Sequence, residues 1–330
     1  MIFPGRNRSS RSFILLESLA SLSVLSMIVT GVVVGAIAIM ETGNYVADVA
    51  AAQDRADQIF SLLKMPADLC GYGLPKSAPL YRQAFAQAGI KEPFNWDGVI
   101  SVMDNKIINN VFRKNGVCRI VYGIPTGACL MRSSVISDDQ VRISAKVIGK
   151  SEGGKVMLDR LDPVKSPDRP RSVKNWLLFG SALPQACPMW LSGDMEVSFI
   201  GKKLNLVWNK TAFPDAPINI HKHDNLFYMG AIEFGADKTS KGEDIFYINN
   251  LRGGGRQPRE LGIIDARFEL HPGRKILRVL LLVRGDRRYE EIKTKDVPAG
   301  WPAEYASDIP NEARHYRLFA FAESFELKNL

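Results

Sequence analysis

The sequence predicts an α+β protein in which a long N-terminal helix precedes a β-rich globular head. Apolar residues are concentrated near the N-terminus, where residues 13–40 contain 20 apolar residues and a single charge, Glu17. Apolar positions then recur at helical spacing as far as residue 65. Beyond Pro66 this periodicity disappears, turn residues become frequent, and short stretches typical of β-strands follow.

The overall composition is that of a folded protein. The chain has 330 residues, of which 46% are hydrophobic and 24% are charged. These values exclude wholesale disorder, a collagen-like sequence and a protein that crosses the membrane many times. The formal net charge of +8 is moderate, so it permits a nucleic-acid or membrane-surface partner without requiring one.

The apolar N-terminal segment is long enough to cross a membrane. The 23 residues from Ser18 to Met40 carry no charge, and as a helix they would span about 34 Å. The preceding residues 1–12 contain three arginines and no acid, and such basic flanks stay in the cytoplasm. The rest of the chain is therefore expected on the other side of the membrane.

Two simpler explanations of this segment are open at this point. A cleaved secretory signal has an apolar region of about 7–15 residues, which is shorter than this one. An uncleaved signal anchor fits the length but does not account for Glu17. A carboxylate inside an apolar span is costly and usually has a functional partner.

A helix is predicted for residues 13–65, with residues 13–40 as its membrane-spanning part. An apolar stripe lies on one face of its second half and consists of Tyr45, Val49, Ala52, Ala56, Ile59 and Leu63. Pro66 is expected to end the helix, because proline lacks a backbone donor and clashes with the preceding turn. Gly31 and Gly35 form a GxxxG pattern, which fits close helix packing and equally a weak helical segment.

The head, residues 66–330, is predicted to be β-rich. One hairpin is predicted from residues 117–122 and 128–132 around a turn at 123–127, and another from residues 196–200 and 203–208. The other predicted strands are residues 141–148, 226–234, 244–248, 262–270, 276–283 and 316–326. A short helix is predicted near residues 81–88, and exposed loops at residues 165–171 and 298–310.

Four cysteines are present, and an oxidising compartment would let them form disulfides. Cys118 and Cys129 flank the predicted turn at 123–127, so a bridge across that hairpin is expected, which leaves Cys70 with Cys187. Four cysteines allow three pairings, and free buried thiols are the alternative. Metal ligation by the cysteines is not expected, because no CxxC spacing occurs.

The N-terminus resembles the processing site of type IV prepilins and type II secretion pseudopilins, in residues 12–17 (SFILLE). In that family a short basic leader is cut immediately before a phenylalanine, whose new amino group is methylated. A glutamate stands at the fifth mature position. The resemblance implies that residues 1–12 are a cleaved leader, that prepilin peptidase cuts between Ser12 and Phe13, and that Phe13 is methylated. Ser12 replaces the glycine that usually precedes the cut.

The same resemblance gives Glu17 a role in assembly register. The ammonium group of Phe13 in one subunit can pair with Glu17 of a neighbour inside an apolar filament core. Each buried charge is then compensated by the other. Residues 13–40 would form the membrane span before assembly and the filament core afterwards. The resemblance also implies that the second half of the helix packs on the β-rich head.

Later segments resemble one branch of the family, the PilW-like minor pilins. They are residues 68–73 (DLCGYG), 93–98 (PFNWDG), 278–284 (RVLLLVR) and 325–329 (FELKN). The resemblance implies a non-enzymatic subunit that helps to initiate or cap a type IV pilus. It would act through helix packing and head contacts.

The resemblance also implies partners and a location. The implied partners are other minor and major pilins, prepilin peptidase, a pilus-tip adhesin, and inner-membrane lipid before assembly. The implied location is the bacterial inner membrane, with one span, a cytoplasmic N-terminus and a periplasmic head, and then the pilus tip. The alternatives are a minor pseudopilin of a type II secretion system and a signal-anchored periplasmic enzyme.

Catalytic motifs are missing from the sequence. It contains no GxSxG, HExxH or Walker loop, so no catalytic residue, cofactor or metal is expected. His221 and His223 stand at an HxH spacing that an exposed polar turn also explains. The basic stretch 252–295 has few interleaved aromatic residues to stack bases, so DNA binding is not expected.

Overall fold

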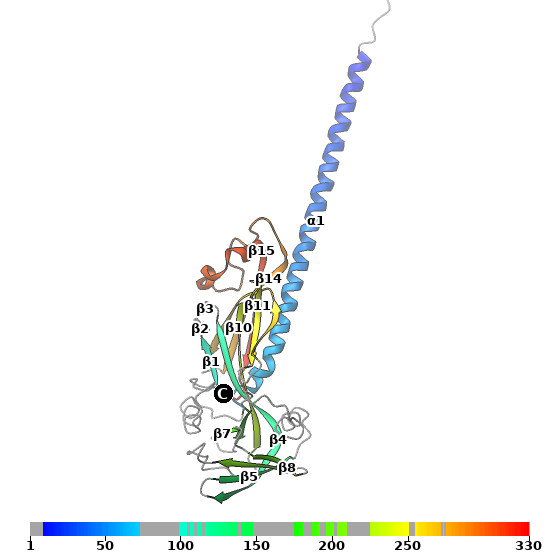
Figure 1. Cartoon of the computed structure of the whole chain (residues 1–330). Coiled ribbons are helices and arrows are strands. Elements are labelled where there is room, and N and C mark those ends of the chain that lie inside the picture. Colours follow the sequence, from blue (N-terminus) through cyan, green and yellow to red (C-terminus); the bar gives the residue numbers. More distant parts are fainter. Residues whose placement is uncertain are drawn as a thin grey trace, which may run out of the picture. The chain divides into compact units, whose positions relative to one another are not determined.

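The chain divides into two compact units, Met1–Ala51 and Ala52–Leu330 (Figure 1). The first contains the N-terminal part of one helix, and the second combines the end of that helix with the β-strands. The structure is a computed structural model. It describes residues 9–72, 99–103, 106–108, 111–113, 116–137, 140–147, 175–180, 186–191, 196–200, 203–209, 225–250, 255–271, 273 and 275–329.

The helix, α1 (Ser9–Leu69), is a single element of 61 residues. It confirms the predicted long N-terminal helix and extends beyond both expected ends, residues 13 and 65. Pro66 lies inside its last turn, where a missing donor removes one hydrogen bond and the helix continues for only three more residues. The chain turns away through Gly71, whose φ of 73° lies in the left-handed region that glycine adopts without strain.

Ten antiparallel strands form the larger sheet of the head. Seven follow one another in the order β12-β11-β10-β4-β5-β9-β8, while β1 pairs with β4, and β6 pairs with β10 and β7. The strands are β1 (Ile100–Met103), β4 (Val117–Ser137), β5 (Gln140–Val147), β6 (Asn175–Gly180), β7 (Ala186–Leu191), β8 (Glu196–Ile200), β9 (Lys203–Asn209), β10 (Asn225–Lys238), β11 (Asp244–Asn250) and β12 (Gly255–Leu261).

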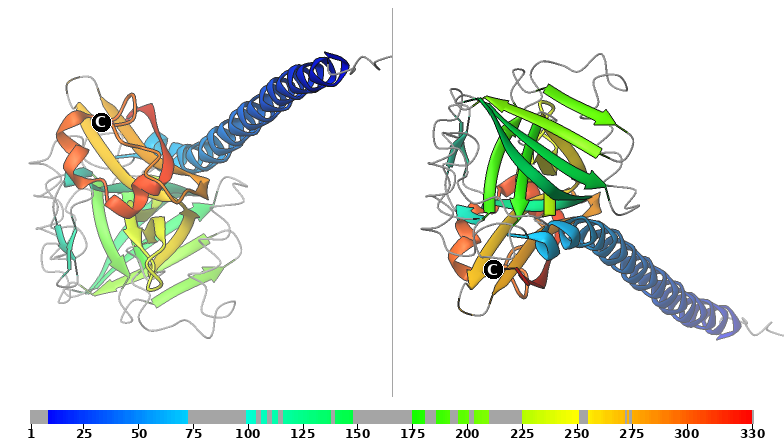
Figure 2. Two further views of the ribbon diagram at one scale, coloured as in Figure 1. Left: turned by 90° about the horizontal axis from the view of Figure 1, so that it is seen from above. Right: turned by 90° about the horizontal axis from the view of Figure 1, so that it is seen from below.

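A smaller antiparallel sheet has the order β13-β14-β15, with β13 (Ile263–His271), β14 (Ile276–Arg288) and β15 (Tyr316–Glu326). Figure 2 shows this sheet (yellow-orange to red) as a layer distinct from the larger one (green to yellow). Between β14 and β15 the chain forms two 3-10 helices, η3 (Ala303–Asp308) and η4 (Asn311–His315). The strands β2 (Lys106–Ile108) and β3 (Val111–Arg113) form a separate pair.

Most predicted strands are confirmed, namely β5, β10, β11, β13, β14, β15 and the hairpin of β8 and β9. Six strands were not predicted from the sequence, and they are three to seven residues long: β1, β2, β3, β6, β7 and β12. Strands this short show little period-2 alternation, and β12 also contains Pro258. The expected helix at 81–88 and the expected loop at 165–171 lie outside the described residues.

The predicted hairpin at residues 117–132 is wrong, because this whole stretch belongs to the single strand β4. The expected turn at 123–127 runs along β10 instead, where Gly123 pairs with Met229 and Pro125 pairs with Phe227. A register shift follows at once between Phe227 and Leu226. A bulge of this kind accommodates a proline that cannot donate to the ladder.

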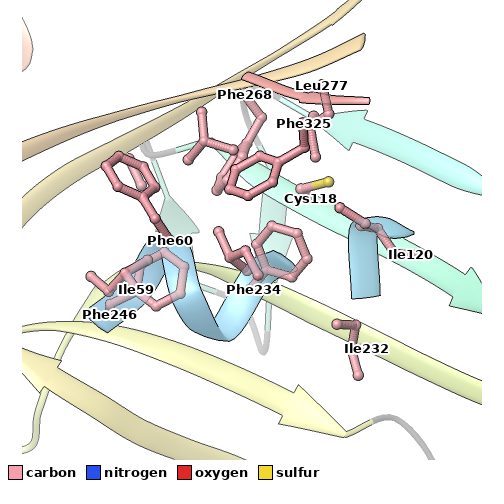
Figure 3. Close-up of a cluster of buried hydrophobic side chains, with 14 of the residues drawn as sticks. Ile59, Phe60, Cys118, Ile120, Ile232, Phe234, Phe246, Phe268, Leu277 and Phe325 are labelled. Carbon is pink, nitrogen blue, oxygen red and sulfur yellow. The ribbon is translucent and has the colours of Figure 1, made fainter. Parts of the chain in front are cut away.

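One apolar core joins the end of α1 to both sheets (Figure 3). Phe234 of β10 and Phe268 of β13 pack edge to face with ring centroids 5.3 Å apart. Phe60 of α1 reaches Phe325 of β15 at 6.3 Å. Four residues of the predicted stripe belong to the helix side of this core and are fully buried, namely Ala52, Ala56, Ile59 and Leu63. The core of the head is therefore incomplete without residues 52–69 of α1. Tyr45, which was also expected in this stripe, is 51% exposed.

A second core lies on the other face of the smaller sheet. In β14, Leu281 and Val283 belong to the first core, whereas Leu280 and Leu282 belong to the second, as strand alternation requires. The loop expected to be exposed at 298–310 supplies the buried Trp301 and Ile309 to this second core. The expectation of an exposed loop is thus wrong for these two residues.

Replacing Gly230 with alanine is expected to destabilise the head. Gly230 pairs with Tyr122 across β10 and β4, and a Cβ at Gly230 would lie 2.6 Å from a carbon of the Tyr122 ring. We expect Gly230→Ala to lower the free energy of unfolding by about 1–3 kcal/mol. Chemical denaturation of the full chain in detergent would measure this loss.

The matched control is Gly273→Ala, because a Cβ at Gly273 meets no atom within 4 Å. Equal stability of the two variants would contradict the close packing of the Tyr122 ring on Gly230.

Candidate assembly helix and its seat in the head

The N-terminal half of α1 exposes large apolar side chains along its whole length. Leu16, Met27 and Ile39 are between 72% and 75% exposed. A helix that is apolar all round is typical of a membrane span or of the interior of an assembly. By length and composition α1 can cross a membrane. The other exposed apolar residues are Leu19, Leu22, Val24, Leu25, Ile28, Val29, Val32, Val33, Val34, Ile37, Met40, Tyr45 and Val46.

Glu17 is exposed near the start of this apolar surface. Ser12 and Phe13 also lie within α1, and their side chains are outside the described part of the chain. Cleavage, methylation and the register role of Glu17 stay predictions.

Arg55 fastens the second half of α1 to the strands of the head. Its Nη1 donates to the carbonyl oxygen of Arg284 at 2.7 Å, and its Nη2 donates to the Asp286 carboxylate. Its Nε lies 3.8 Å from Glu260. Gly262 leaves room for the guanidinium, because a Cβ there would lie 3.1 Å from Nη1. In the sequence, the only signal for this contact is the position of Arg55 next to Ala56 of the apolar stripe.

The last turn of α1 is held by the C-terminal residues. Asn329 Nδ2 donates to the carbonyl oxygen of Asp68 at 2.8 Å, and Lys328 Nζ lies 3.3 Å from the Asp68 carboxylate. Just beyond the helix, Gly71 N donates to the carbonyl oxygen of Val121 in β4 at 2.9 Å. The part of α1 inside the head is thus fixed near both of its ends.

A buried ion-pair cluster joins β13 to η3. The Arg267 guanidinium contacts the carboxylates of Asp265 and Asp308, each at 2.9 Å, and lies 4.2 Å from the centroid of the Tyr305 ring. Asp265 also accepts a hydrogen bond from Ala266 N at 2.8 Å. Burial raises the pKa of Asp265 to about 6, although Arg267 acts to lower it.

A second buried cluster crosses the larger sheet. Glu233 is 2% exposed and accepts hydrogen bonds from Arg119, whose Nε and Nη2 lie 2.8 Å and 2.7 Å from Oε2. The hydroxyl of Tyr247 lies 3.4 Å from Oε1. Arg256 stacks on the Tyr247 ring at 4.7 Å and donates to Asp237 at 2.9 Å. In both clusters the buried carboxylates are matched by guanidinium groups, which is the arrangement that buried charges require.

The described residues contain no group of three His, Cys, Asp or Glu side chains arranged to hold a metal ion. His271 is exposed, and Nδ1 of His315 lies 3.2 Å from the carbonyl oxygen of Tyr289. His221 and His223 lie outside the described residues.

The expected bridge between Cys118 and Cys129 is wrong. Both residues lie on β4, eleven positions apart, which is about 35 Å along a strand, whereas a disulfide needs Cα atoms within about 7 Å. Cys70 forms an isolated backbone bridge with Tyr122 of β4. All three are free, buried thiols, and the side chain of Cys187 lies outside the described residues.

Comparison with protein-family models, with curated proteins and with solved structures found no match to this chain. Its architecture is pilin-like, because a long apolar N-terminal helix contacts antiparallel sheets in an α+β fold. That likeness comes from the helix and the head of the chain itself.

Asp265 is expected to give the protein an unusual pH dependence. Its folded pKa of about 6 lies above the ordinary value of 3.8, so the folded state binds the extra proton between these values. The contribution of this proton to the free energy of unfolding is fully present below pH 4 and is lost as the pH rises through 6. Between these values the free energy of unfolding falls by at most about 1.4 kcal/mol per pH unit. Asp265→Asn should remove this slope from unfolding free energies measured between pH 4 and 6.

Glu269→Gln is the control, because Glu269 lies on the same strand and its side chain is partly exposed. It should keep the slope of the natural protein. A slope unchanged by Asp265→Asn would contradict the assignment of this proton to Asp265.

The buried thiols are expected to resist alkylation in the folded protein. Burial raises the pKa of Cys70 to about 12, and it raises the pKa of Cys118 well above its ordinary value, with a further contribution from nearby Cys70. The thiolate is the reactive form, so Cys70 should react roughly a thousandfold more slowly at pH 8 than an exposed thiol. Iodoacetamide labelling with peptide mapping, before and after unfolding, would measure this. Rapid labelling of Cys70 in the folded protein would contradict its burial.

Proposed function

We propose that the protein is a minor pilin of the PilW-like type, which helps to initiate or cap a type IV pilus. The observation that carries the proposal is the division of α1 into two halves. Its first half is apolar and exposed, and its second half belongs to the core of the head. A filament subunit needs this arrangement, because the exposed half must pack against other helices while the head stays folded.

Before assembly, the apolar half of α1 holds the subunit in the inner membrane. The three arginines of residues 1–12 keep the N-terminus in the cytoplasm, and the head lies in the periplasm. The mechanism is packing without catalysis. The buried carboxylates of Glu233 and Asp265 are engaged by arginines within the head, which is consistent with a structural role for these charges.

During assembly, prepilin peptidase removes residues 1–12, and the new ammonium group of Phe13 pairs with Glu17 of a neighbouring subunit. Each charge compensates the other inside the apolar core, so the pair favours one helix register over others. The partners are other minor and major pilins, with a tip adhesin as a further partner of the head.

Replacing Glu17 with alanine tests this mechanism. Glu17→Ala should leave the protein in the membrane, because the apolar segment is unchanged, but should impair its incorporation into pili. Loss of one partner from a buried charge pair costs on the order of 3–5 kcal/mol, which corresponds to roughly a hundredfold or more in incorporation. Immunoblots of sheared pili and of membrane fractions would measure both quantities.

Glu41→Ala is the matched control, because it removes a carboxylate at the other end of the apolar segment. It should assemble like the natural protein. Mass spectrometry of the mature N-terminus provides the second readout, and an N-methylated Phe13 is expected. Normal incorporation of Glu17→Ala, or an uncut Ser12–Phe13 bond in assembled subunits, would argue against the proposal.

A further inference from the structure

Three cationic side chains surround one aromatic ring beyond the end of β14. Lys293 Nζ lies 5.0 Å, Arg317 Cζ 5.1 Å and Arg287 Cζ 5.6 Å from the centroid of the Tyr289 ring. Ile292, next to Lys293 in the chain, is 45% exposed. These five residues are called the cationic rim.

The rim and its neighbours carry an excess of positive charge. Three acidic residues, Glu290, Glu291 and Asp296, stand among five basic ones, so two positive charges remain. The adjacent Asp286 is engaged by Arg55. An anionic partner therefore fits this surface better than a cationic one. The basic residues are Arg287, Arg288, Lys293, Lys295 and Arg317.

The mixture of side chains in the rim is typical of a membrane interface. Arginine and lysine combine a charged head with an aliphatic stem, and Tyr289 and Ile292 add amphipathic and apolar surface. Single-stranded nucleic acid would need an open aromatic face for base stacking. Tyr289 is only partly exposed and is already surrounded by cations, which favours lipid over nucleic acid.

The rim lies at the end of the head where α1 enters it. Where α1 enters the head, the Arg55 guanidinium donates to the carbonyl oxygen of Arg284, close to the end of β14. At the last turn of α1, the carbonyl oxygen of Asp68 accepts a hydrogen bond from Asn329. Asn329 follows the end of β15, and this end of β15 pairs with the start of β14. The helix therefore runs antiparallel to β14 (labels in Figure 1). The rim and the chain that leads to the apolar segment thus share one end of the head.

We propose that the cationic rim docks on anionic phospholipid headgroups of the bilayer that holds the apolar part of α1. The inference rests on the membrane-anchored state of the proposed function, and it does not depend on pilus assembly. Each basic side chain near an anionic surface strengthens binding by about fivefold. Because the head is tethered by α1, the lipid is present at high effective concentration.

The test uses the full chain in lipid nanodiscs, made either of phosphatidylcholine alone or with added phosphatidylglycerol. Hydrogen exchange of residues 286–296, followed by mass spectrometry, reports contact at the rim. We expect exchange in this segment to be at least about threefold slower in the anionic discs. One molar salt should abolish the difference, because it shortens the Debye length to about 3 Å.

A double variant locates the effect. Arg287→Gln with Lys293→Gln should weaken docking by about 25-fold and remove most of the protection. The matched control, Arg278→Gln with Lys328→Gln, removes the same charge at the other end of the smaller sheet. Arg278 and Arg287 are separated by about 30 Å along β14. The control should keep the protection.

The outcomes separate this inference from the proposed function. A chain that does not enter nanodiscs at all would overturn the membrane-anchored state. A chain that enters them but exchanges equally in both lipids would overturn the docking proposal alone. If inorganic phosphate added to phosphatidylcholine discs slowed the exchange of residues 286–296 equally, the rim would be assigned to free phosphate. Equal slowing by added duplex DNA would assign the rim to nucleic acid. Either result would overturn docking on lipid.

Discussion

The structure depends on the packing of one continuous helix in two different environments. Residues 52–69 of α1 bury Ile59 and Leu63 against both sheets, and each such side chain contributes about 1.5–3 kcal/mol when fully buried. The preceding half offers Leu16, Met27 and Ile39 to solvent. The core of the head is incomplete without residues 52–69 of the helix. The preceding half is stable only where its apolar side chains are kept from water.

Two sets of polar contacts fix residues 52–69 of the helix to the head. Arg55 bonds to Arg284 and Asp286 near one end, and Asp68 is held by Asn329 near the other. One attachment lies on β14 and the other just beyond the end of β15, at opposite ends of this part of the helix. The helix therefore cannot slide or pivot without breaking one of them. A force applied to residues 52–69 of the helix would therefore be transmitted to the strands of the head.

The buried charges of the head serve as cross-links between elements. Arg267 ties β13 to η3 through Asp308, and thereby holds the connection between β14 and β15 over the second core. Arg119 ties β4 to β10 through Glu233. Breaking such a pair leaves one charge buried and uncompensated, which costs far more than loss of an exposed pair. These contacts favour a single arrangement of the strands in a head that contains free buried thiols.

Local sequence pattern was enough to predict several elements. The apolar run, the stripe from Ala52 to Leu63 and most of the longer strands follow from periodicity, because helices and strands repeat at different spacings. Glu17 also stood out, because it is a charge in an apolar span. Three other features became visible only in the folded chain: residues 123–127 extend a strand, Cys118 and Cys129 are far apart, and Arg55 and Arg267 are attachment points. These outcomes depend on partners distant in the chain, since β10 completes the hydrogen bonds of β4 and the buried guanidiniums find carboxylates on other elements, and no local pattern records such partners.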